Sequence, residues 1–310
     1  MRPTILNTHL SPSLPNLIQA NTWLAQAWAH AQAFKRNPHA PYIGRFAPSP
    51  SGKLHQGSLV TALASYLHAH WHGGIWRVRM EDVDTSRCTH ATGAHQLATL
   101  RTLGFQFDEP VLWQTERFAA YRAEFERLYA QNRVYPCTCT RSRMTQNTDS
   151  AHRCAQGIDE GTTIRTWRFR ADNQLVTWMD ETGHKHTQTV DDFVLKRNAL
   201  SINEWTYALA VVVDDAHQGI THVVRGEDIR ESTARQIALQ QALGYPTPQY
   251  NHVPLLCNAA GDKLSKSEQA PELDALNPVE ALLHAWQFLG GNDFDCADVT
   301  EFWQIVLENT

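Results

Sequence analysis

Residues 42–58 read YIGRFAPSPSGKLHQGS, and three local patterns follow one another within them. Residues 42–46 are typical of a short strand, and residues 47–52 are rich in the Pro, Ser and Gly of turns. Apolar residues then recur at helical spacing, at Leu59, Ala62, Leu63, Tyr66 and Leu67. Strand, loop and helix in this order form the first half of a βαβ unit, so we expect an α/β fold with a parallel sheet.

The same alternation continues along the rest of the chain. Patterns of strands or helices occur at residues 16–34, 74–80, 87–103, 115–131, 207–213, 220–224, 231–243 and 278–289. The run 207–213 is the longest apolar stretch, and we predict that it is a buried strand. It is far shorter than the roughly 20 residues that cross a bilayer, so no membrane association is expected.

Composition describes a globular chain whose charge is unevenly distributed. The 310 residues are 42% hydrophobic and carry six cysteines, too few for a disulfide scaffold. No secretory signal begins the chain, so we expect a cytoplasmic protein. The net charge is −5, yet residues 1–80 contain no Asp or Glu and seven Lys or Arg. This asymmetry can focus phosphates on one region, although scattered solvated charges explain it equally well.

Two polar loops have features of a phosphate site. The loop 48–58 places His55 and Gly57 between a strand and a helix start, where backbone N–H groups and the helix dipole favour an anion. On its own, this loop also fits the structural connection of any α/β protein. The second loop, GDKLSKS at 261–267, adds the lysines and hydroxyls that can close over a triphosphate.

Together, the two loops resemble the two signature motifs of class I aminoacyl-tRNA synthetases, the first in its glutamyl form. Further matches, in the family's order, are RMEDVDTSR at 79–87, YALAVVVDD at 207–215 and VRGED at 224–228. Ser58 departs from the family, whose first signature usually ends in histidine. The chain also ends at residue 310, which leaves no room for an anticodon-binding domain after Ser267. The sequence therefore resembles a shortened paralogue of glutamyl-tRNA synthetase.

This resemblance implies both the reaction and its partners. The shortened paralogues activate L-glutamate with ATP without needing tRNA. They then transfer it to queuosine, at the anticodon wobble position of tRNA(Asp), so the anticodon stem-loop is the expected RNA partner. Mg²⁺ is expected with ATP, and a monomer is expected. An enzyme that charges a tRNA 3′ end and a catalytically inactive tRNA-binding paralogue remain the alternatives.

The resemblance also assigns the site residues. His55 and Lys266 are expected to be catalytic, with ATP contacted by His55, Gly57, Ser58, Lys263, Ser265 and Lys266. Glutamate is expected to contact Arg45, Phe46, Ala47, Pro48, Ser49, Glu81, Tyr207 and Arg225. The chemistry is consistent, because each arginine can hold a carboxylate in a bidentate manner and a glutamate carboxylate can pair with the substrate ammonium.

The cysteines at 137–154 suggest a structural zinc site. Cys137, Cys139 and Cys154 lie close in sequence, and thiolates are good zinc ligands. A tetrahedral site needs a fourth group, and the family's tyrosine before the last cysteine is missing here. His152 is our candidate, and Asp149, water or no metal at all are the alternatives.

Five parts are expected along the chain. An N-terminal extension occupies residues 1–40. Residues 41–134 and 201–250 form the two halves of a Rossmann-like catalytic domain, as the resemblance implies. An inserted subdomain of zinc type occupies residues 135–200. Residues 251–310 carry the second polar loop and a small helical C-terminal part.

Overall fold

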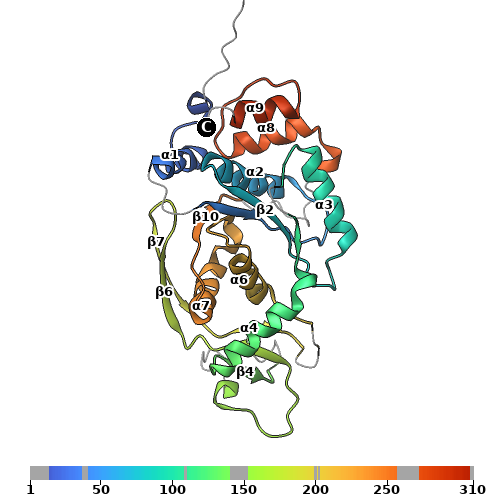
Figure 1. The fold of residues 1–310 in the computed structure, drawn as a ribbon, viewed down its shortest axis with the longest axis vertical. Helices are drawn as coiled ribbons and strands as arrows, with labels where there is room; N and C mark the ends of the chain where they lie inside the picture. Colours follow the sequence, from blue (N-terminus) through green and yellow to red (C-terminus); the bar gives the residue numbers. More distant parts are fainter. Residues whose placement is uncertain are drawn as a thin grey trace, which may run out of the picture.

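A parallel sheet forms the centre of the molecule (Figure 1). The computed structural model describes residues 14–36, 41–107, 110–139, 153–198, 201, 203–256 and 272–307. Strands β1 (Ile43–Phe46), β2 (Ile75–Met80) and β3 (Leu112–Trp113) are parallel, as are β9 (His222–Gly226) and β10 (Gln249–Val253). The two sets lie side by side, because the N–H of Thr221 donates to the carbonyl of Ile43 at 2.9 Å. The predicted parallel α/β arrangement is confirmed.

Helices cover both faces of this sheet (Figure 1). On one face, α2 (Gln56–Trp71) packs with α1 (Trp23–Arg36), α8 (Pro278–Phe288) and α9 (Val299–Leu307), and α3 (His90–Thr102) adds side chains to the same core. Because α2 lies between the sheet and other helices, it is buried nearly all round. The other face is covered by α6 (Tyr207–His217) and α7 (Thr233–Leu243).

The predicted strand at residues 207–213 is wrong, since these residues begin helix α6. A short apolar run buried on all sides fits a core strand and a core helix equally well. Here Leu209–Val213 are buried between neighbouring elements, and the helix continues through Asp214 and Asp215. Tyr207 therefore occupies the first turn of a helix.

The segment between the two halves of the sheet is mostly antiparallel. Strands β4 (Val134–Cys137), β5 (Thr166–Phe169) and β8 (Phe193–Lys196) pair with one another, after α4 (Phe118–Ala130). A hairpin of β6 (Gln174–Met179) and β7 (Lys185–Val190) runs along one side of the molecule toward α1 (Figure 1). The sequences of residues 163–169 and 175–179 are typical of short strands, and these residues overlap β5 and β6.

The N-terminal helix belongs to the main core. Leu24 and Ala31 of α1 are fully buried, as is Leu14 in the short turn that precedes it. The sequence predicts that this helix begins at residue 16, but it begins at Trp23. The Thr22 hydroxyl accepts a hydrogen bond from the N–H of Ala25. Short 3₁₀ turns lie at Leu14–Leu17, Gln114–Arg117, Arg153–Gln156, Glu227–Ser232 and Leu273–Ala275. Among the described helices, none is long and apolar enough to cross a membrane.

Candidate active site

A pocket of about 330 Å³ opens where β1 ends and α2 begins. Gly226, the last residue of β9, and Asp228 form part of its wall. The carboxyl ends of neighbouring parallel strands meet at one edge of a sheet, where α/β proteins bind ligands. Six residues predicted to contact ATP or glutamate line this pocket: Phe46, Pro48, Ser49, His55, Gly57 and Ser58.

Hydrogen bonds from the rest of the domain hold the β1–α2 loop in place. The side chain of Gln96 on α3 donates to the carbonyls of Ser49 (3.2 Å) and Gly52 (2.6 Å). His55 has an extended backbone, and its carbonyl accepts the N–H of Ser58 at 2.9 Å, which begins α2. The positive end of the α2 dipole therefore lies at the pocket.

Gly57 allows the His55 ring to lie close against the helix start. A Cβ at position 57 would lie 3.2 Å from Cε1 and 3.3 Å from Nδ1 of that ring. A side chain at this position would require the imidazole to shift slightly. The structure thus explains the spacing of His55 and Gly57 by steric need.

The described residues on both sides of the second polar loop lie at the same pocket. Lys263, Ser265 and Lys266 lie outside the described residues. Before them, Leu255 and Leu256 line the pocket. After them, Glu272 forms a backbone bridge with His55, and the N–H of Leu273 donates to the carbonyl of Leu54 at 3.2 Å.

A buried network of charges surrounds Arg45, which is 4% exposed. Its Nε lies 3.4 Å from Oδ1 of Asp215, and one Nη donates to the carbonyl of Val224 at 3.3 Å. Arg79 contacts the same Asp215 oxygen at 2.8 Å and an oxygen of Glu81 at 3.2 Å. Burial alone would raise the pKa of Asp215, but Arg79 and Arg45 hold it below its ordinary value. The carboxylate that neutralises the arginines therefore stays ionised.

Arg225 and Tyr207 are joined by a shared partner, Gln236. The two Nη atoms of Arg225 donate to Gln236 and Thr233, each at 2.7 Å, and Nε donates to His252 at 3.3 Å. The Gln236 amide also donates to the Tyr207 hydroxyl at 3.4 Å. A guanidinium has five N–H groups, so these three hydrogen bonds leave two for a ligand within the described surroundings.

The residues predicted to contact glutamate interact with one another electrostatically. Burial raises the pKa of Glu81, and the charges of Arg79 and Arg45 offset only part of that effect. Burial, followed by the nearby charge of Glu81, likewise raises the pKa of the Tyr207 hydroxyl, while Arg225 and Arg45 oppose this. Two cations and one carboxylate in a poorly solvated site are the complement of an amino acid with an acidic side chain.

The protein-family model for the catalytic domain of class I tRNA synthetases (E and Q) matches residues 43–275. The chain belongs to this family. As a class I synthetase, it is an enzyme, as its sequence predicted.

Proteins of similar sequence indicate which branch of the family this chain resembles most. The glutamyl-Q tRNA(Asp) synthetase of Burkholderia cenocepacia (strain HI2424) is 48% identical to this synthetase over 272 residues, which cover 82% of this chain and 90% of that protein. The protein of the same name from Janthinobacterium sp. (strain Marseille) is 44% identical over 284 residues, covering 86% and 95%. These relatives confirm the predicted resemblance to the shortened glutamyl paralogues.

A solved structure supports the same fold. The glutamate tRNA ligase from Elizabethkingia meningosepticum, in complex with its amino acid, superposes with a TM-score of 0.65 at 28% identity. The match covers 74% of the synthetase described here and 52% of the ligase. The chain thus spans about half the length of that ligase.

Three predicted zinc ligands of the synthetase lie together. The Sγ atoms of Cys137, Cys139 and Cys154 all lie within 4.8 Å of one another, with Cys139 and Cys154 at 3.7 Å. Cys137 and Cys154 are buried, and none of the three forms a disulfide. Burial, followed by the neighbouring thiols, raises the pKa of Cys139 to about 12. His152, the predicted fourth ligand, lies outside the described residues.

Sequence reasoning missed the residues that hold the arginines. Arg79 and Asp215 lie in motifs used for the family resemblance, but no role was predicted for them. Gln236 and Thr233, which orient Arg225, lie on α7 and outside every motif. Among these residues, only Asp215 carried a signal, because the two carboxylates after the apolar run 207–213 have to find partners in the core.

Proposed function

We propose that this synthetase activates L-glutamate with ATP in the absence of tRNA and then transfers it to queuosine at the wobble position of tRNA(Asp). The observation that carries the proposal is the pocket at the β1–α2 loop, which adjoins the charged group at three points. Its lining residues Phe46 and Gly226 directly follow Arg45 and Arg225 in the chain, and the N–H of Glu81 donates to the carbonyl of Pro48, also in the lining, at 2.9 Å. The names of the curated relatives support the choice of acceptor.

In the first step, an oxygen of the glutamate α-carboxylate attacks the α-phosphorus of ATP. The bond from that phosphorus to the bridging oxygen breaks, and pyrophosphate leaves. The residues supply position and charge, without a covalent nucleophile. His55 and the first turn of α2 would hold the phosphates from one side, and Lys263, Ser265 and Lys266 would close from the other. Mg²⁺ would come with the nucleotide.

Recognition of glutamate depends on matching its charges. Arg225 and Arg45 each have N–H groups left for a carboxylate, Glu81 would accept the ammonium, and Tyr207 would donate to the side-chain carboxylate. Glutamine offers one acceptor oxygen where glutamate offers two. Its binding would leave a buried guanidinium poorly paired, which is the basis for rejecting it.

In the second step, a ring hydroxyl of queuosine attacks the carbonyl carbon of the glutamyl adenylate, and AMP leaves. The acceptor hydroxyl belongs to the modified base itself. That base must therefore leave the stack of the anticodon loop before its hydroxyl can reach the adenylate. A tRNA substrate fits a cytoplasmic location, and for the oligomeric state we propose a monomer.

We also propose that Cys137, Cys139 and Cys154 hold a structural zinc ion. Three convergent sulfur atoms fit the thiolate ligand sets of such sites, and His152 is the candidate for the fourth position. When bound, the ion would supply a fold-stabilising crosslink between β4 and the turn at Arg153–Gln156.

Two measurements test the proposed reaction. Glutamate-dependent exchange of pyrophosphate into ATP, with RNA omitted, should occur and should fail with glutamine. Labelled glutamate should then appear on tRNA(Asp) that contains queuosine and be absent from the same tRNA without it. Equal labelling of both tRNAs would instead indicate an enzyme that charges the 3′ end, and lack of exchange would indicate an inactive tRNA-binding paralogue.

A further inference from the structure

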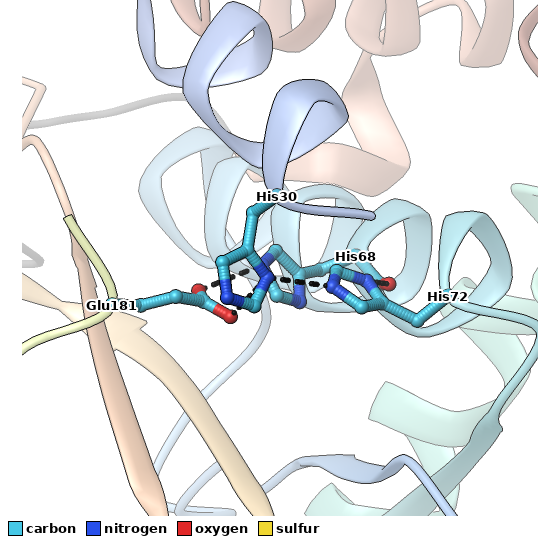
Figure 2. A group of neighbouring side chains, drawn as sticks. All are labelled: His30, His68, His72 and Glu181. Atoms are coloured by element: carbon cyan, nitrogen blue, oxygen red, sulfur yellow. Dashed lines mark hydrogen bonds and ion pairs between the residues drawn. The ribbon is translucent and has the colours of Figure 1, made fainter. Parts of the chain in front are cut away.

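A second polar cluster lies at the edge of the sheet opposite the active-site pocket. His68 and His72 lie at the C-terminal end of α2, whose first turn forms the pocket. At 1.5 Å per residue, His68 lies about 20 Å along the helix from His55. His30 comes from α1, and Glu181 comes from the turn between β6 and β7 (Figure 2).

The four side chains turn toward one another, as Figure 2 shows. Nδ1 of His30 lies 2.9 Å from Nε2 of His72 and 3.0 Å from Oε1 of Glu181. Nε2 of His68 lies 2.8 Å from Oε2 of Glu181. One ligand atom from each residue lies within 4.8 Å of all the others. Three imidazoles and one carboxylate are thus brought to a common point by three separate segments.

Outer hydrogen bonds orient these side chains. Nδ1 of His72 donates to the carbonyl of His68 at 2.6 Å, and the Tyr42 hydroxyl pairs with Nδ1 of His68 at 2.7 Å. Asn251 donates to Oε2 of Glu181 at 2.7 Å. The other nitrogen of each buried ring, Nε2, is thereby directed into the cluster. Metal-binding histidines are held in the same way, through the ring nitrogen that does not bind the ion.

Two buried atoms inside the cluster lack a hydrogen bond of acceptable geometry. They are Nε2 of His68 and Oε1 of Glu181, although each lies within ion-pair distance of a facing atom. The His68 side chain is completely buried, and that of Glu181 is 3% exposed. Such atoms carry a desolvation cost that a cation between them would offset.

Two of the four side chains have the charge state that a cation needs. Burial lowers the pKa of His72 to about 3, so its ring is neutral, the form that binds metals. Burial alone would raise the pKa of Glu181, but the facing His68 and His30 hold it well below its ordinary value. Glu181 is therefore an ionised ligand. The hydrogen bond to Glu181 raises the pKa of a third side chain, His30, so a metal ion would have to displace a proton from that ring.

We propose that His30, His68, His72 and Glu181 bind one divalent transition-metal ion of the zinc type. Tetrahedral coordination with Zn–N bonds of about 2.0–2.1 Å places the ligand atoms roughly 3.3 Å apart. Small rotations of the side chains would open the observed contacts to that distance. Imidazole and carboxylate are ligands that zinc accepts readily.

The role of this ion is structural. Four protein ligands leave no open position for a substrate, and the cluster lies far from the pocket. The ion would clamp α1 and the β6–β7 turn onto the end of α2, joining three segments that are distant in sequence. A hydrogen-bonded network without metal is the competing explanation.

The test compares metal content among full-length variants. His30→Gln is the main variant, because the His30 side chain is 34% exposed and the change leaves the buried core intact. Glu181→Gln is the second. His284→Gln is the matched control, since His284 is exposed on α8. Each protein is stripped with a chelator, reloaded with Zn²⁺ alone and analysed for bound zinc and thermal stability.

We expect both cluster variants to bind one equivalent of zinc less than the wild type and the His284→Gln control. The rise of Tm on zinc addition should also be smaller in them. All four proteins keep the cysteines, so any zinc held there cancels in the comparison. Equal zinc content in all four would overturn the proposal and favour the hydrogen-bonded network.

Cobalt substitution identifies the ligands of the lost ion. If the equivalent missing from His30→Gln was held by His and Glu, the thiolate-to-cobalt absorption of the protein stays unchanged. If that absorption falls together with the metal content, the lost ion belonged to the cysteines, and the proposal is wrong.

Discussion

Glu272 forms a backbone bridge with His55, the residue that precedes α2 as its N-cap. The Glu272 carboxylate also lies 2.6 Å from Nζ of Lys53, which is exposed in the same loop. Glu272 therefore lies next to the pocket at the β1–α2 loop. Leu256, on the other flank of residues 257–271, lines this pocket.

Lys266 lies between these two flanks, and its replacement tests the role proposed for the loop. We expect Lys266→Ala to lower kcat of glutamate-dependent ATP–pyrophosphate exchange by about 10²–10³-fold, because one charge that stabilises the transition state is lost. KM for glutamate should change little. Lys185→Ala, an exposed lysine on β7, is the control. A large rise in KM with kcat unchanged would contradict the prediction.

Arg225 is expected to select glutamate through its planar guanidinium group, which can hold both oxygens of a carboxylate. Arg225→Lys keeps the charge but loses the bidentate geometry, so KM for glutamate should rise at least tenfold, about 1.4 kcal/mol. KM for ATP should stay within a factor of about two, well below one tenfold step. Arg235→Lys, on α7 and paired with Asp191 at 2.7 Å, is the control. If both KM values rise together, the substitution has damaged the fold rather than the amino-acid site.

The raised pKa of Glu81 leads us to expect that glutamate binding depends on pH. Because burial raises its pKa, Glu81 gains a proton at a pH where an exposed glutamate, with a pKa of about 4.3, is still ionised. A protonated carboxyl no longer attracts the ammonium of the substrate. KM for glutamate should therefore rise as the pH falls toward that range.

Glu81→Gln tests this origin directly. The variant should have a raised KM at every pH and should lose most of the acid dependence. Glu126→Gln, an exposed change on α4, should leave the profile of the wild type in place. A profile that is identical in Glu81→Gln and the wild type would assign the titration to another group.

Asp214 is predicted to matter for stability. It is fully buried and accepts hydrogen bonds from Gln114 (3.1 Å), Arg117 (2.7 Å) and Tyr121 (2.6 Å), which join α4 and its preceding turn to α6. Asp214→Asn leaves the Arg117 cation without its counter-charge, which should lower the free energy of unfolding by about 2–4 kcal/mol.

Urea unfolding, followed by far-UV circular dichroism, measures this loss. The matched control is Asp191→Asn, which removes a half-exposed carboxylate from its pair with Arg235. An exposed pair contributes only about 0–1 kcal/mol, so the control should unfold close to the wild type. If the two variants unfold at the same urea concentration, the Asp214 network contributes no more than a surface pair.

Local sequence patterns predicted β1, the loop after it and α2, since each depends on residues close in sequence. Turn residues between a strand and a helix, followed by apolar spacing, leave few alternatives. The same reasoning failed for residues 207–213. This run has no polar face, so its sequence shows no hydrophobic periodicity that could distinguish a helix from a strand. Packing against the sheet and α4 makes that run a helix.

For the candidate site, the sequence by itself determined which chemical groups are present and in which motifs they occur. Such motifs are short, so their residue types and spacings can be identified without knowledge of the fold. Only the tertiary structure decided that Asp215 neutralises Arg45 and that Gln236 joins Arg225 to Tyr207. The meeting of His30 with Glu181 was also beyond the sequence. Contacts between distant segments depend on how helices and strands pack in three dimensions, and no local period records that packing.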